Sequence, residues 1–276
     1  METSALDEQA VAAEARLLWE AERTRVAVAP VIERHPSATI ADAYAIQLAG
    51  RALRLGAPGA ALVGRKVGLT SRVMQEMMGV DQPDFGYLTA AMISPDGAAL
   101  DPAEFLAPRV EAEIAFRLRA PLSGAALTID DVLAATEAVA PALEVIDSRI
   151  ADWRIGIVDT IADNASSGHV VLGEWTALDA LAGLDLATVP VTLAVTPDGD
   201  ANTGTGAAVL GHPAAPIAWL ARALHQYDAG AAIDAGAVVI PGAVSRALPV
   251  AAGQTARATF AGLGEVTATF EARQLQ

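Results

Sequence analysis

Cysteine is absent from this 276-residue sequence, aromatic residues make up only 4% of it, and its 18 Lys and Arg are outnumbered by 33 Asp and Glu. The lack of cysteine excludes disulfides, thiolate metal ligands and a cysteine nucleophile. The net charge of −15 argues against a nucleic acid or an anionic membrane surface as a partner, because both attract clustered basic residues.

Long apolar runs are lacking as well. No stretch approaches the roughly 18 uninterrupted apolar residues that a membrane-spanning helix needs. Residues 1–10 carry acidic side chains where a secretory signal would carry basic ones. We therefore expect a cytoplasmic protein that binds no membrane. Apolar residues still make up 53% of the chain, which is enough to bury the core of a large domain.

The order of patterns along the chain predicts an α+β fold rather than a regular alternation of strands and helices. Helices are expected over 7–24, 41–55, 72–78 and 129–139, and one more begins near Pro213. β-Prone runs are 61–67, 109–118, 143–146, 169–172, 189–195, 237–240 and two near the end. These patterns divide the chain into an N-terminal helical segment, 1–60, and a second domain, 61–276.

Two glutamates alternate with apolar residues on the strand expected over 109–118. Because side chains alternate between the two faces of a strand, Glu111 and Glu113 share one face and the apolar residues share the other. The pair favours a solvated outer face, which Arg117 and Arg119 would continue, over a functional site. Glu-X-Glu alone is weak evidence for chemistry.

Glu144 changes this balance, because its neighbours on the same strand face are Ala142 and Ile146. A carboxylate in such surroundings is expected to be buried, and it must then be protonated, paired or bound to a metal. Three acidic oxygen donors with no cysteine or nearby histidine suit Mg²⁺ or Mn²⁺ better than zinc. The pattern by itself does not bring Glu144 next to the Glu111–Glu113 pair.

Lys66 lies near the end of the apolar run 61–67. Desolvation there would lower the pKa of its amine towards the range that suits proton transfer. Thr70 or Ser71 then caps the helix over 72–78, whose N-terminus could receive a substrate carboxylate. An ordinary exposed lysine before a capped helix is the alternative, and these residues alone do not decide between the two.

A third polar stretch, 159–168, reads as turns in which Asp and Asn bond their own backbone. The four histidines, at 35, 169, 212 and 225, are expected to be structural or exposed. No nucleophile elbow, phosphate-binding loop or dinucleotide fingerprint occurs, so nucleophilic hydrolysis and nucleotide chemistry have no support.

Seven longer motifs follow one another between residues 64 and 243, and their common order is more specific than any one of them. They are GRKVGLTS at 64–71, GVDQPDFGYL at 79–88, PRVEAEIAF at 108–116, PALEVIDSRIADW at 141–153, VDTIADNASSG at 158–168, LGHP at 210–213 and VVIPGA at 238–243. This set resembles the 2-keto-4-pentenoate hydratase family of the fumarylacetoacetate-hydrolase superfamily.

The resemblance implies a mixed β-rich roll with N-terminal and peripheral helices, and a metal-dependent catalytic domain over 61–276. It implies that Glu111, Glu113 and Glu144 bind a divalent ion, Mg²⁺ or Mn²⁺. The implied reaction adds water to a 2-hydroxy-2,4-dienoate, through its 2-oxo tautomer, to give a 4-hydroxy-2-oxo acid in the catabolism of aromatic or related ring compounds. A homo-oligomer is implied too, and association with a neighbouring pathway enzyme is a further expectation.

The same resemblance implies that Lys66, Asp84 and Ser166 line the pocket and handle protons, with Thr70 and Ser71 as candidates for the substrate carboxylate. Many members carry Thr-Gly-Ala-Leu-Gly near the end, where this chain has Pro-Gly-Ala-Val-Ser at 241–245. We expect this departure to touch the pocket rim at most and to affect substrate choice more than chemistry.

Three other functions stay open at this point. A 4-oxalocrotonate decarboxylase would share the metal triad, but a second substrate carboxylate calls for another cation, which the sequence does not identify. An acyl-pyruvate hydrolase would need a His–Glu partnership that we cannot place. A non-catalytic metal-binding scaffold subunit would have no need for Lys66 beside three glutamates.

Overall fold

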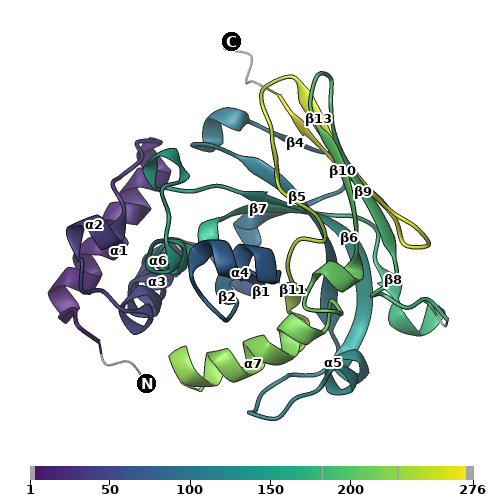
Figure 1. Cartoon of the computed structure of the whole chain (residues 1–276), viewed down its shortest axis with the longest axis horizontal. Coiled ribbons are helices and arrows are strands. Elements are labelled where there is room, and N and C mark those ends of the chain that lie inside the picture. The colour runs from purple at the N-terminus through teal and green to yellow at the C-terminus, as the bar shows by residue number, and fades with distance from the viewer. Residues whose placement is uncertain (1–3, 182, 229, 272–276) are drawn as a thin grey trace.

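The structure is a computed structural model that describes residues 4–181, 183–228 and 230–271 (Figure 1). Two mixed β-sheets with helices around them confirm the expected α+β, β-rich roll. The helices are α1 (Glu8–Thr24), α2 (Val31–Arg34), α3 (Ile40–Leu55), α4 (Arg72–Met78), α5 (Ile129–Ala135), α6 (Ile157–Ala162) and α7 (Ala215–Tyr227). Short 3₁₀ turns lie between them, and the one that matters below is η4 (Asn164–Ser166).

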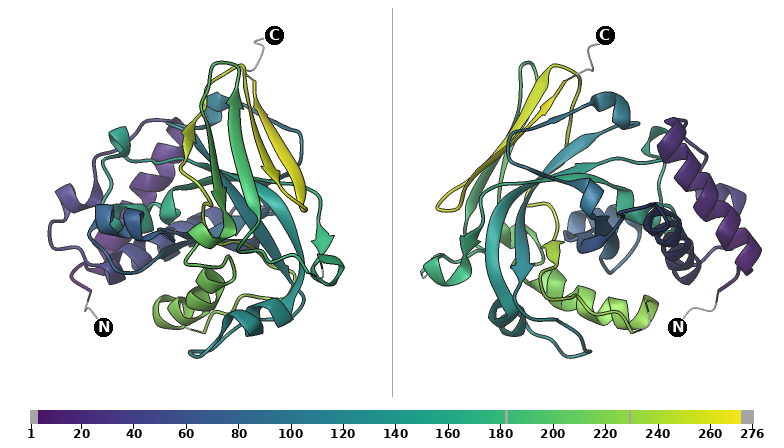
Figure 2. Two further views of the ribbon diagram at one scale, coloured as in Figure 1. Left: turned by 45° about the vertical axis from the view of Figure 1, so that its right-hand side comes forward. Right: turned by 180° about the vertical axis from the view of Figure 1, so that it is seen from behind.

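The larger sheet has nine strands in the order β2-β1-β11-β5-β6-β7-β3, with β12 paired to β5 and β8 paired to β6. Its strands are β1 (Leu62–Gly68), β2 (Asp84–Thr89), β3 (Ile93–Pro95), β5 (Arg109–Leu118), β6 (Thr136–Ile146), β7 (Ser167–Leu172), β8 (Thr176–Ala177), β11 (Val238–Ile240) and β12 (Leu248–Pro249). Figure 2 shows that the long strands β5 and β6 are bent, so that the sheet wraps around one of its own faces.

The smaller sheet has five strands in the order β10-β9-β13-β14-β4. They are β4 (Ala98–Leu100), β9 (Pro190–Thr196), β10 (Ala201–Thr205), β13 (Gln254–Phe260) and β14 (Gly264–Phe270). A turn at Asp198-Gly199 joins β9 to β10, and Asp198 has the positive φ of 58° that such turns favour. This sheet packs beside the larger one, away from α1–α3 (Figure 1).

The N-terminal helices form where the sequence predicts them. Asp7 caps α1 through the N–H of Ala10, and Thr39 and Asp42 form a reciprocal capping box at the start of α3. Tyr44 of α3 stacks on Phe85 of β2, so these helices contribute to the same large core as the sheets. The division at residue 60 stays a prediction, and the ends of its two segments, 1–3 and 272–276, lie outside the described residues. None of the described helices has the length and apolar character needed to cross a membrane.

The helix predicted over 129–139 is wrong at its C-terminal end. α5 stops at Ala135, and β6 begins at the next residue and pairs with β5 through Val139 and Phe116. Alanine and valine at 138–140 fit a helix or a strand almost equally well, so the long-range pairing with β5 decides their structure.

Two apolar clusters lie on opposite faces of the larger sheet. Val110, Ala112, Ile114 and Phe116 belong to the large core, as the alternation on β5 predicts. The smaller cluster lies on the other face, and its buried members are Leu88, Met92, Ala115, Ala142, Val170, Leu172 and Ile240. Because Ala115 is on the face of β5 that also carries Glu111 and Glu113, this cluster forms an apolar floor beside the glutamates.

Asp42 fixes the start of the described chain to α3. Its carboxylate accepts hydrogen bonds from Ser4 Oγ (2.5 Å), from the N–H groups of Ala5 and Leu6, and from Thr39. Burial alone would raise the pKa of Asp42, but the bonds from Ser4, Leu6 and Thr39 outweigh it and hold the pKa well below its usual range.

We expect D42N to lower the free energy of unfolding by about 1–3 kcal/mol near neutral pH, because it removes the charged acceptor of these bonds. The folded-state pKa lies below the unfolded value of about 3.9, so this stabilisation is present above that pH and is lost as the pH falls. Urea unfolding at pH 7 and pH 3 measures both effects. An equal gap between wild type and D42N at the two pH values would contradict the prediction.

Candidate active site

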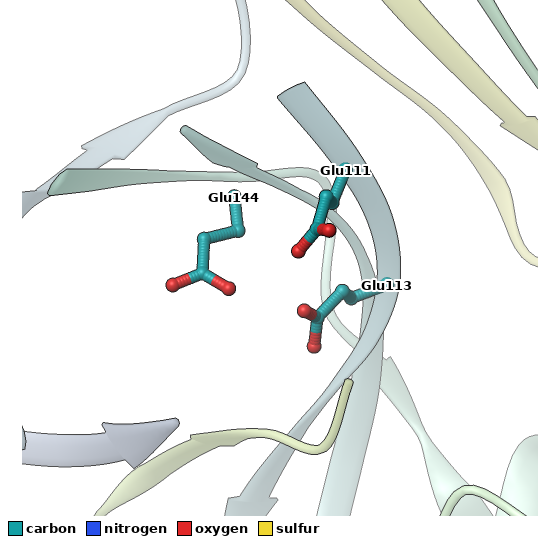
Figure 3. A group of neighbouring side chains, drawn as sticks. All are labelled: Glu111, Glu113 and Glu144. Atoms are coloured by element: carbon teal, nitrogen blue, oxygen red, sulfur yellow. The ribbon is translucent and has the colours of Figure 1, made fainter. Parts of the chain in front are cut away.

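The carboxylates of Glu111, Glu113 and Glu144 converge on one face of the larger sheet. The antiparallel register of β5 and β6 places Glu144 directly opposite Glu111. One oxygen from each of the three residues lies within 4.8 Å of the others, and Figure 3 shows the carboxylates turned toward a common space. The interpretation of Glu-X-Glu as a solvated face is wrong, because Glu113 is 1% exposed and Glu111 is partly buried. Glu144 is fully buried, as its apolar neighbours predict.

These carboxylates are poorly compensated by the protein. Both oxygens of Glu144 and Oε1 of Glu113 accept no hydrogen bond from any described residue, and Oε2 of Glu113 accepts one from the N–H of Gly242 at 2.7 Å. Burial, and then repulsion from Glu144, raise the pKa of Glu111 to about 7 and that of Glu113 well above its usual range. Buried acidic oxygens without donors are an arrangement that a hard cation would stabilise.

Lys66 of β1 supplies the ammonium group of the site. It is 3% exposed, its Nζ lies 3.4 Å from Oε2 of Glu144, and it donates a hydrogen bond of 2.8 Å to the carbonyl of Ala165. Burial by itself would lower the pKa of Lys66, but the carboxylates of Glu144, then Asp84 and the other two glutamates, raise it above the usual value. The predicted lowering is therefore wrong for this arrangement, because the sequence did not reveal how many carboxylates surround the amine.

Asp84, the first residue of β2, is buried opposite Gly68 of β1. A Cβ atom at position 68 would lie 2.3 Å from Oδ1 of Asp84, so only glycine leaves room for this carboxylate. Oδ2 of Asp84 accepts a hydrogen bond from the hydroxyl of Thr160 at 3.3 Å. Burial raises the pKa of Asp84 in spite of the nearby Lys66 ammonium.

Ser166 ends a strained turn. The polar stretch 159–168, expected to form simple turns, includes the end of helix α6. The three residues of η4 follow, and they adopt positive φ angles of 55°, 51° and 53° although none of them is glycine. Such conformations cost on the order of 1–3 kcal/mol each and persist only where the surroundings enforce them. Asparagine tolerates this region, but Ala165 and Ser166 give no sequence signal for it.

Arg149 is a buried arginine that no sequence pattern indicates, and it holds both ends of this turn. Nε of Arg149 donates to Oδ1 of Asp163 (2.5 Å), and its Nη1 donates to the carbonyl of Ser167 (2.8 Å), so the guanidinium spans both ends of the turn. The side chain of Asn164 pairs with the backbone N–H and C=O of Tyr87, which ties the turn to β2. These contacts present the Ala165 carbonyl to Lys66.

The two candidates for substrate-carboxylate binding have different roles. Ser71 caps α4 by accepting a hydrogen bond from the N–H of Met74 at 3.3 Å, which leaves its O–H free to donate. Thr70 is buried against Gly242, where a Cβ atom would lie 2.0 Å from Oγ1 of Thr70. The expectation that the segment 241–245 touches only the rim of the pocket is therefore wrong. The N–H of Gly242 donates to Glu113, and its Cα packs closely against Thr70.

The histidines make structural contacts, as expected. His35 pairs with Glu14, His169 with Ser94, and Nδ1 of His212 accepts a hydrogen bond from the backbone N–H of Ala214. His225 is exposed on α7. The site chemistry is thus left to carboxylates, one lysine and hydroxyl groups.

Residues 63–271 match the model of the family described as fumarylacetoacetate (FAA) hydrolase C-terminal. The chain belongs to this family. It is 42% identical over 266 residues to 2-hydroxyhexa-2,4-dienoate hydratase of Comamonas testosteroni, covering 96% of this chain and 98% of the relative. It is also 42% identical over 265 residues to 2-keto-4-pentenoate hydratase of Burkholderia vietnamiensis, with the same coverage. This member of the family is accordingly an enzyme of the hydro-lyase type. The alternative of a non-catalytic metal-binding scaffold subunit is thereby removed.

Solved structures match over almost the whole chain, and the following one illustrates them. It is 4-oxalocrotonate decarboxylase from Pseudomonas putida G7 complexed with magnesium and adipate, with a TM-score of 0.90 and 36% identity, covering 97% of this chain and 100% of that one. Fumarylpyruvate hydrolase from Pseudomonas aeruginosa, complexed with Mn²⁺ and pyruvate, shares the fold at a TM-score of 0.60 and 16% identity, covering 76% of this chain and 90% of that one.

We expect G242A to destabilise the protein more than G253A does. Both glycines have positive φ, 120° and 85°, but a Cβ atom meets nothing within 4 Å at Gly253 and would collide with Thr70 at Gly242. The control should lose about 1–2 kcal/mol from backbone strain, and G242A should lose about 1–3 kcal/mol more from overpacking. Urea unfolding measures the difference, and equal losses would show that the close approach does not constrain the site.

Proposed function

We propose that the protein is a divalent-metal-dependent hydratase that adds water to a 2-hydroxy-2,4-dienoate and yields a 4-hydroxy-2-oxo acid. The observation that carries this proposal is the convergence of Glu111, Glu113 and Glu144 beside Lys66, on a chain 42% identical to two hydratases over nearly its whole length. The names of those relatives support a dienoate or keto-pentenoate as the substrate.

Glu111, Glu113 and Glu144 would hold Mg²⁺ or Mn²⁺. Oxygen donors without sulfur or imidazole suit a hard cation, and the oxygens of Glu113 and Glu144 that accept no hydrogen bond from the described residues fit such a role. When bound, the cation supplies stabilisation of the enolate-like charge that an oxo acid develops during its reaction.

We assign the movement of protons to Lys66, Asp84 and Ser166. The Nζ of Lys66 lies 3.4 Å from Oε2 of Glu144 and donates to the carbonyl of Ala165, which places the amine at the glutamates for proton transfer. Asp84 is its buried carboxylate partner, and Ser166 positions a reacting group or relays a proton. Thr70 and Ser71 both remain candidates for the substrate carboxylate, because the hydroxyl of each can donate a hydrogen bond.

A decarboxylase is the second candidate, favoured by one specific observation. Arg109 lies on the same face of β5 as Glu111, and its guanidinium is stacked 4.6 Å from the centre of the Trp153 ring. It is the cation that a second substrate carboxylate would require. The chain is 40% identical over 241 residues to 4-oxalocrotonate decarboxylase of Pseudomonas sp. strain CF600, covering 87% of this chain and 89% of that one, which is a shorter match than those to the hydratases.

We also propose a cytoplasmic homo-oligomer. The support for this proposal is the family resemblance of the sequence, and the same holds for association with a neighbouring pathway enzyme.

A substrate comparison tests the proposed reaction. With Mg²⁺ or Mn²⁺ present, the enzyme should remove the absorbance of 2-hydroxypenta-2,4-dienoate and its alkyl homologues without releasing carbon dioxide. A 2-oxo-3-enedioate should be the poorer substrate, because binding its second carboxylate would depend on the exposed Arg109 alone. Carbon dioxide release from the enedioate, with no consumption of the dienoates, would replace the hydratase by the decarboxylase.

Two variants should separate metal binding from proton transfer. E144Q should abolish tight Mn²⁺ binding, whereas K66M should bind Mn²⁺ and lose at least about two decades in kcat, the scale of general acid–base catalysis. Glu137 lies on the same strand as Glu144 but is exposed and paired with Arg117, so E137Q is the matched control. Calorimetric titration and turnover measure the two effects, and undiminished Mn²⁺ affinity in E144Q or near-normal turnover in K66M would remove that residue from its role.

A further inference from the structure

Thr160 lies between two of the residues assigned to proton transfer. It belongs to α6, is buried, and places its hydroxyl 3.3 Å from Oδ2 of Asp84 and 3.3 Å from Oγ of Ser166. Asp84 belongs to β2 and lies 76 residues before Thr160, whereas Ser166 belongs to η4 and lies 6 residues after it. The Thr160 hydroxyl therefore connects these two segments. No local sequence pattern distinguishes Thr160 from the rest of the polar stretch 159–168.

The chemistry of the three groups fixes the direction of this chain of hydrogen bonds. An ionised carboxylate can only accept, so Thr160 donates its single hydroxyl proton to Asp84. Its oxygen then accepts from Ser166, which must donate. The oxygen of Ser166 is left with lone pairs only, and so it can accept a proton from a group bound in the site.

The surrounding structure holds the ends of this chain in place. The buried side-chain amide of Gln47 on α3 donates to the carbonyl of Phe85 (2.8 Å) and to the carbonyl of Ile161 (2.9 Å). Phe85 follows Asp84, and Ile161 follows Thr160, so one amide fixes the two backbones beside the two interacting side chains. At the other end, Arg149 clamps the turn that carries Ser166.

We infer that Thr160 is a positioning residue that relays a proton between Ser166 and Asp84. In the relay, Ser166 takes one proton from a group in the site and passes its own hydroxyl proton to Thr160. Thr160 passes its hydroxyl proton to Asp84. Only O–H bonds form and break, one proton moves from the site to Asp84, and the reverse sequence returns it. This inference rests on the proposed function, since it assigns protons within that reaction.

The test compares T160V with T160S in the full-length enzyme. Valine keeps the shape of threonine and removes the hydroxyl, whereas serine keeps the hydroxyl. Thr136 provides a matched control, because it is also buried and its hydroxyl donates to the carbonyl of Val132, away from the glutamates. T136V therefore reports the cost of losing a buried threonine hydroxyl elsewhere.

We expect T160V to lose at least about tenfold in kcat with little change in KM, given that general acid–base catalysis contributes about 10²–10⁴-fold. T160S should recover most of this loss, T136V should turn over like the wild type, and T160V should bind Mn²⁺ as the wild type does. Wild-type kcat in T160V would overturn the relay. A loss in T160V that T160S does not recover would also overturn it, as would a weakened Mn²⁺ affinity, because both indicate a packing role.

The comparison uses whichever substrate the wild type consumes. If that substrate were the enedioate and not a dienoate, the proposed hydratase would fail while the relay was still tested on the decarboxylation. If the wild type consumed neither, both would be overturned. The intrinsic signal of proton transfer is a solvent deuterium isotope effect on kcat, which should differ between T160V and T160S.

Discussion

The structure depends on the gathering of four carboxylates, three buried and one partly buried, around one ammonium group on a sheet with an apolar floor. Glu113, Glu144 and Asp84 are buried, Glu111 is partly buried, and Lys66 is the cation among them. Placing ionised carboxylates side by side in such surroundings is costly, and the raised pKa values of all four express this cost. A bound divalent cation would relieve it, so the excess of negative charge links the fold to metal-dependent chemistry.

Several features of the backbone serve this gathering. The register of β5 with β6 sets Glu144 against Glu111, and the glycine at 68 leaves room for Asp84. The glycine at 242 brings a backbone N–H to Glu113 and approaches Thr70. On the far side, a strained turn held by a buried ion pair delivers the Ala165 carbonyl and the Ser166 hydroxyl. Strained backbone and forced close contacts thus occur at the site itself, as they do where geometry is used for catalysis.

Much of this could be read from the sequence, and the exceptions have physical causes. The limits of β5 and the two faces of its residues follow from period-two alternation, and α3 and α4 begin and end at the caps that the sequence signals. The partner of β5 could not be read, because strand register is a long-range property. A local pattern therefore predicts a helix at Val139, where pairing with β5 produces a strand. It likewise predicts a lowered pKa for Lys66, because the carboxylates that raise this pKa come from other segments. Arg149 and Thr160 act through contacts with segments distant in sequence, which no local pattern encodes.

The central claim is that Glu111, Glu113 and Glu144 hold one divalent cation. The most direct measurement is a crystal structure grown with Mn²⁺ and read by the anomalous signal of the metal. The account predicts a single peak bonded to one oxygen of each glutamate, at about 2.0–2.3 Å for oxygen ligands of a hard divalent ion. A peak elsewhere in the molecule, or glutamate side chains that face apart around an ordered water, would contradict it.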